Sequence, residues 1–201
     1  DARISRIYEG TNEINRMLAV GMLVKKAMKG HVNLLEPATA VGQELMGIPS
    51  FETPDYSQLF AEEKEMLAKL KKVFLMVAGS AVQKLGTELE KNQQLLLAAS
   101  DILIEIYMAE SAILRTEKNV NRSSEEAQKE QIAMSKLYLY KASKIIQARA
   151  EEGIASFAEG DEQRMMLMGL KRFTKYANLP NVIELRSMIA DKVTDENKYP
   201  F

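Results

Sequence analysis

The residues best suited to chemistry lie near the start of the 201-residue chain, within residues 3–16, RISRIYEGTNEINR. Gly10 permits a sharp bend, because glycine adopts backbone angles that other residues avoid. Thr11 is a favoured N-cap residue and an amphipathic run begins at Ile14, so a helix is expected to start here. Glu9 would then lie on a bend before a helix N-terminus, where the first N–H groups have no intrahelical acceptor. A carboxylate in that place could serve as a general base when an apolar ligand covers it.

Spacing alone also allows a simpler interpretation of the same stretch. Glu9 could be a solvated residue before an ordinary helix cap, since surface carboxylates far outnumber catalytic ones. Glu13, in the first helical turn, suits the positive end of the helix dipole under either interpretation. The residue types alone leave both alternatives open.

The pattern R-I-x-x-I-Y-E-G-T-N-E-I-x-R resembles the signature near the C-terminus of acyl-CoA dehydrogenases. The resemblance implies that Glu9 is the base that removes the α-proton of a fatty acyl-CoA thioester, while the β-hydrogen leaves as hydride to FAD. It also implies that Tyr8 and Gly10 contact the substrate. The implied FAD contacts are Thr11, Asn12 and Glu13. The resemblance is sharp over about the first 30 residues. The rest is similar, more loosely, to the extra helical region of the very-long-chain type.

The resemblance implies a larger parent enzyme, because most of an acyl-CoA dehydrogenase lies upstream of this motif. The chain is therefore expected to be a C-terminal fragment that is inactive and does not hold FAD by itself. The parent would dehydrogenate long-chain fatty acyl-CoA thioesters in β-oxidation, pass electrons to an electron-transferring flavoprotein and form homo-oligomers. A bacterial cytoplasm is favoured over a mitochondrial matrix or inner-membrane surface. The alternatives are a non-catalytic helical module for docking or oligomerisation, and part of an acyl-CoA oxidase.

Composition narrows the function classes. The net charge is −1 with 27% charged residues, so no strong field favours nucleic acid. The absence of cysteine excludes disulfides, a thiolate nucleophile and cysteine-ligated zinc. Asp101, Glu105 and Glu110 lack a companion histidine at metal-ligand spacing, so they are expected to form a solvated or salt-bridged face and not a metal site. The sole histidine, His31, follows a helix-ending glycine and is expected to be a loop residue.

Helical periodicity runs through most of the chain, without strand alternation, and predicts an all-α fold. Helices are expected over 12–29, 57–91, 94–118, 124–157, 165–176 and 181–193, with Ser57 and Asn181 as caps. Residues 1–30 would end a catalytic helical domain, 31–57 would form a linker, and 58–201 would form a bundle of four or five helices. Its core is expected to include Leu70, Val77, Ile102, Ile106, Ile145 and Ile146.

The expected linker has features of its own. Glycine and proline are spread through it, and a short helix is expected only over residues 38–46. Its apolar residues could lie on the protein itself or make peripheral contact with a membrane or a partner, and packing on the protein is favoured. These residues are Leu34, Leu35, Leu45, Met46 and Ile48.

Overall fold

The computed structural model describes residues 2–47 and 55–201, and over those residues the chain consists of helices and loops without a strand. The prediction of an all-α fold is confirmed. The α-helices are α1 (Asn12–Met28), α2 (Leu35–Met46), α3 (Ala61–Leu85), α4 (Gln93–Val120), α5 (Lys129–Phe157), α6 (Gly160–Phe173) and α7 (Val182–Glu196). Short 3-10 helices cover Ile4–Arg6 (η1), Gly86–Lys91 (η2) and Glu126–Gln128 (η3). The expectations for Ile48 and for the prolines at 49 and 54 lie outside the described residues.

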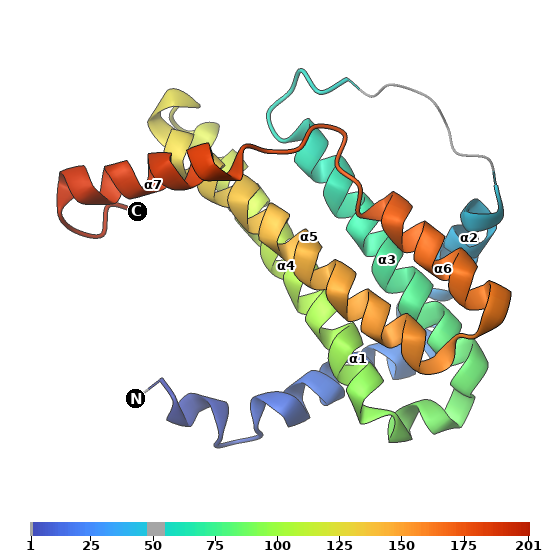
Figure 1. Ribbon diagram of the computed structural model, residues 1–201. Coiled ribbons are helices and arrows are strands. Elements are labelled where there is room, and N and C mark those ends of the chain that lie inside the picture. The colour runs from blue at the N-terminus through green and yellow to red at the C-terminus, as the bar shows by residue number, and fades with distance from the viewer. Residues whose placement is uncertain (1, 48–54) are drawn as a thin grey trace.

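The long helices α4 and α5 lie side by side through the middle of the molecule (Figure 1). Helices α3 and α6 pack on one side of this pair, and α2 lies against both α3 and α6. Helix α1 crosses α4, while α7 packs on α5 (Figure 1). The region 58–201 contains the five α-helices α3 to α7, which agrees with the predicted four or five.

The core forms where the apolar stripes of these helices meet. Five of the six residues predicted to be buried are indeed buried, among them Leu70, Ile102 and Ile146 at 0% exposure. The prediction for Ile145 is wrong, because its side chain is 41% exposed. The buried stripe of α5 runs through Leu139, Ala142, Ile146, Ala150 and Ile154, at steps of three and four residues. Ile145 lies about 100° from Ile146 around the helix axis and falls outside this stripe.

The predicted helix 57–91 is shorter in the structure. Ser57 does not cap it, since the backbone N–H and hydroxyl of Ser57 bond to the carboxylate of Asp55. The residue before α3 is Phe60, a buried residue in the left-handed conformation at φ +60°. At the other end, Gly86 at φ +50° ends α3 and the chain continues as the 3-10 helix η2. At α7 the predicted cap is confirmed, because Asn181 Oδ1 accepts a hydrogen bond from the Glu184 N–H at 3.3 Å.

Helix α2 begins three residues earlier than predicted and docks on the bundle. Pro37 lies in its first turn, where the missing N–H costs nothing. The backbones of α2 and α3 approach closely at Gly79, where an added Cβ would lie 2.9 Å from the Cβ of Ala38. Glu44 forms ion pairs with Lys72 of α3 and Arg172 of α6, at 2.7 and 2.9 Å. The helical part of residues 31–57 is therefore packed against the bundle and does not run free.

Candidate active site

The bend predicted around Gly10 is present, and it involves two residues. Glu9 has φ +56° and Gly10 has φ +95°. A left-handed conformation is unfavourable for a residue with a side chain, so the surrounding structure must hold Glu9 there. Thr11 caps α1 as predicted, because its hydroxyl oxygen accepts a hydrogen bond from the Ile14 N–H at 3.3 Å. Glu9 thus lies two residues before the helix cap, with its side chain exposed.

Asn15 is a residue of this bend that the sequence interpretation missed. Its side-chain amide donates a hydrogen bond to the Gly10 carbonyl at 2.9 Å. A Cβ at position 10 would lie 2.9 Å from Asn15 Oδ1, so the close approach of Asn15 needs glycine there. The available signal was an asparagine one turn into the helix, because Asn side chains often bond to nearby backbone groups.

The motif side chains point outward. Tyr8 is 52% exposed, and Glu9, Asn12 and Glu13 are exposed as well. Helix geometry leaves the first N–H groups of α1 without an intrahelical acceptor, so this surface offers hydrogen-bond donors beside the Glu9 carboxylate. The structure places the predicted site residues on one short segment. Within the described residues, their side chains line an open surface of this chain.

Helix α1 is seated on the bundle mainly by its second half. Its buried residues are Val20 and Ala27. Ile14, Leu18 and Met22, which also fall at helical spacing, are about half exposed. The face that packs on the core is instead made of residues offset from those three. It consists of Met17, Val20, Leu23, Val24 and Ala27.

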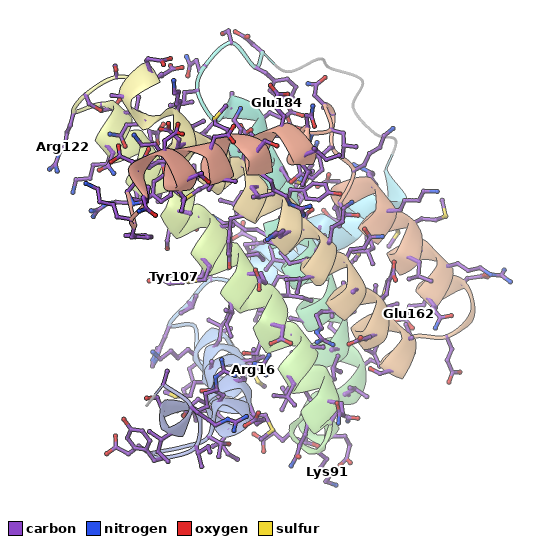
Figure 2. All side chains as sticks on the ribbon, turned by 60° about the vertical axis from the view of Figure 1, so that its left-hand side comes forward. Arg16, Lys91, Tyr107, Arg122, Glu162 and Glu184 are labelled. Carbon is purple, nitrogen blue, oxygen red and sulfur yellow. The ribbon has the colours of Figure 1, made fainter. Side chains whose placement is uncertain are left out.

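A polar cleft with a volume of about 680 Å³ lies where α1 meets α4 and α5. Asp101 of α4 lies in it and forms ion pairs with two arginines, Arg16 of α1 and Arg149 of α5. Figure 2 shows Arg16 on the side of α1 that faces α4. Glu105 accepts a hydrogen bond from the Tyr138 hydroxyl at 3.0 Å. Burial and this carboxylate raise the pKa of Tyr138 to about 12.

Among Asp101, Glu105 and Glu110 of α4, the first and the third form ion pairs, as predicted for a salt-bridged face. Glu110 is paired with Lys71 of α3 at 2.6 Å. Over residues 2–47 and 55–201, no group of three His, Asp or Glu side chains is arranged to hold a metal ion. Over the same ranges, none of the helices combines the length and the apolar character that crossing a bilayer requires. His31 lies in the exposed turn after α1.

Fold and site together indicate a helical domain with a bend before its first long helix, at which the side chain of Glu9 is exposed. The family model of the acyl-CoA dehydrogenase C-terminal domain matches residues 69–172, from within α3 to the end of α6. The chain belongs to the acyl-CoA dehydrogenase family.

Two relatives match almost the whole chain. A Bacillus subtilis protein described as a "Probable acyl-CoA dehydrogenase" is 36% identical over 199 residues, which are 99% of this chain and 33% of that protein. The crystal structure of an acyl-CoA dehydrogenase complexed with FAD from Bacillus anthracis is 39% identical, with a TM-score of 0.91. That match also covers 99% of this chain and 33% of the other. The chain thus spans about a third of the length of both relatives.

Proposed function

We propose that this chain is the C-terminal part of an FAD-dependent acyl-CoA dehydrogenase that acts on long-chain fatty acyl-CoA thioesters in β-oxidation, with Glu9 as its base. The observation that carries the proposal is the left-handed pair Glu9–Gly10, held before the capped N-terminus of α1. Such strain in a residue with a side chain is typical of functional sites, where the geometry of one group matters. Family membership supports the same reaction class.

In this proposal each residue of the bend has a separate role. Glu9 removes the α-proton of the thioester, and the exposure of its side chain leaves the carboxylate free to reach a substrate. Gly10 presents no side chain, so the thioester can approach the backbone beside the base. Tyr8 would line the acyl pocket. Bound FAD supplies a hydride acceptor for the β-hydrogen.

The start of α1 is suited to contact FAD. Thr11, Asn12 and Glu13 would make these contacts, and the latter two are exposed. The free backbone N–H groups of a helix N-terminus are hydrogen-bond donors that suit the anionic diphosphate of such a cofactor. A complete cofactor site needs several converging walls, whereas this segment offers one. We therefore propose that the chain alone neither holds FAD nor oxidises substrate, and that the remaining walls come from the rest of a longer parent.

The division of the chain follows from this role. Residues 1–30 would complete the catalytic helical domain, and residues 58–201 would form the added bundle of the very-long-chain type. Residues 31–57 would connect these two parts, with α2 docked on α3. The parent would transfer electrons to an electron-transferring flavoprotein and form homo-oligomers in a bacterial cytoplasm. The exposed side chains of Leu35 and Met46 on α2 favour a peripheral contact with a membrane or partner at this edge. Exposed apolar residues of α4, such as Tyr107 (Figure 2), also suit a docking function for the bundle.

The test is a single substitution in the full-length parent. Glu9→Gln keeps the size and hydrogen bonding of the side chain but cannot accept a proton. We expect FAD and acyl-CoA binding to persist while the rate of anaerobic flavin bleaching, followed by stopped flow, falls at least about 10²-fold. Glu13→Gln is the matched control and should cost much less, because that carboxylate suits the helix end. A Glu9→Gln enzyme that reduces its flavin at the wild-type rate would show that the base lies elsewhere. Reduced flavin that reacts rapidly with oxygen would favour the oxidase alternative.

A further inference from the structure

Asp101 stands out among the acidic residues of α4 because it connects three helices. Its side chain is only 13% exposed. One carboxylate oxygen pairs with Arg16 of α1, and the other forms an ion pair with Arg149 Nε of α5 at 3.1 Å. By contrast, Glu110 on the same helix is 38% exposed and pairs with Lys71 within the bundle. Asp101 is thus a polar joint between α1 and the two central helices.

The first half of α1 needs such a joint. The buried apolar residues of α1 are Val20 and Ala27, while Ile14 and Leu18 are about half exposed. Hydrophobic burial therefore holds the second half of the helix more firmly than the first. Arg16 lies in the first half, so its ion pair with Asp101 ties down the end of the helix that carries the motif.

From Arg16 the contacts lead directly to the bend. The neighbouring Asn15 donates its hydrogen bond to the Gly10 carbonyl, and Gly10 follows Glu9. Glu9 has φ +56°, a conformation that persists only when its surroundings enforce it. A helix end that moved relative to the bundle would move Asn15, and with it the carbonyl that fixes the bend.

We propose that Asp101 is a positioning residue for the Glu9 bend, acting from the bundle through Arg16 and α1. The inference rests on the proposed function of Glu9, and it assigns part of the C-terminal bundle a role in catalysis. Arg149 pairs with the second oxygen of Asp101, so that the carboxylate is held by an ion pair on each side. Asp101 itself touches neither substrate nor cofactor in this scheme.

The experiment uses the full-length parent with Asp101→Asn, which keeps the shape of the side chain and removes its charge. A base displaced by a fraction of an ångström reacts more slowly, so we expect the rate constant of flavin reduction at saturating acyl-CoA to fall at least about tenfold. FAD content and KM should change much less than this rate constant, because in the proposed function most walls of both binding sites come from the rest of the parent. Glu110→Gln is the matched control on the same helix and should leave the rate within about twofold of wild type. Equal rates for Asp101→Asn and wild type would overturn the inference.

A double-mutant cycle separates positioning from general loss of stability. Arg16→Gln removes the same ion pair from the α1 side, and it also serves as the test if Asp101→Asn fails to fold. When the two residues act through one contact, the double variant should be no slower than the slower single variant. Two fold-changes that multiply would show independent effects and would contradict the proposal.

Amide hydrogen exchange provides a measurement that does not depend on the identity of the base. Asp101→Asn should speed exchange of the amides of residues 15–19 at least about tenfold, whereas Glu110→Gln should not. If Glu9→Gln leaves the rate of flavin reduction unchanged but amide exchange in α1 still responds to Asp101→Asn, the proposed function of Glu9 is wrong, while the role of Asp101 in holding α1 is supported. If exchange is unchanged, the positioning inference fails, whatever Glu9 does.

Discussion

Substitution of Gly79 by alanine tests the docking of α2 most directly. An alanine Cβ at this position would lie 2.9 Å from the Cβ of Ala38, well inside normal contact distance. Neither methyl group can rotate away, so the two helices must separate. Overpacking of this kind costs about 1–3 kcal/mol. Replacing a helical glycine by alanine in itself gains about 1 kcal/mol. We expect Gly79→Ala to lower the free energy of unfolding by about 1 kcal/mol net.

Gly42→Ala on α2 is the matched control, because an added Cβ there meets nothing within 4 Å. It gains the same helix propensity without the clash, so its free energy of unfolding should rise by about 0.5–1 kcal/mol. The difference between the two variants cancels the propensity and reports the overpacking alone, about 1–3 kcal/mol. Urea unfolding followed by circular dichroism would measure it, with the slope m checked for constancy. If both glycines stabilise equally when changed to alanine, α2 does not approach α3 at Gly79, and its docking would need another explanation.

Two further outcomes follow from the core and from the tyrosine beside Glu105. Ile146→Ala should lower the free energy of unfolding by about 2–5 kcal/mol, whereas Ile145→Ala should lower it by less than about 1 kcal/mol. The reason is that only the side chain of Ile146 is fully buried. Equal losses in urea unfolding would show that the buried face of α5 is assigned wrongly. The pKa of Tyr138 is raised from 10.0 to about 12 in the folded chain, so the folded state keeps a proton that the unfolded state releases, and stability should fall as the pH rises through this interval. Tyr138→Phe should weaken that decline between pH 8 and pH 11.5, measured as urea midpoints; an unchanged decline would show that Tyr138 is not protected.

Local signals in the sequence were sufficient to predict most of the helices and their caps. Apolar spacing predicted helices close to α1, α4 and α5, because helical periodicity depends on neighbours a few residues apart. The Thr11 and Asn181 caps and the bend at Gly10 were predicted for the same reason, since a cap or a turn needs only its adjacent residues. Glu9 as the base stays a prediction.

Contacts between helices were decided by the tertiary structure. The sequence offers two adjacent isoleucines on α5, and only the packing of α5 against its neighbours selects Ile146 over Ile145. Asp101 could be predicted to form a salt bridge, but not that its partners are Arg16 and Arg149, which lie 85 and 48 positions away in the numbering. Such pairings depend on how whole helices cross, and that geometry is set by the combined burial of many side chains and not by any local pattern.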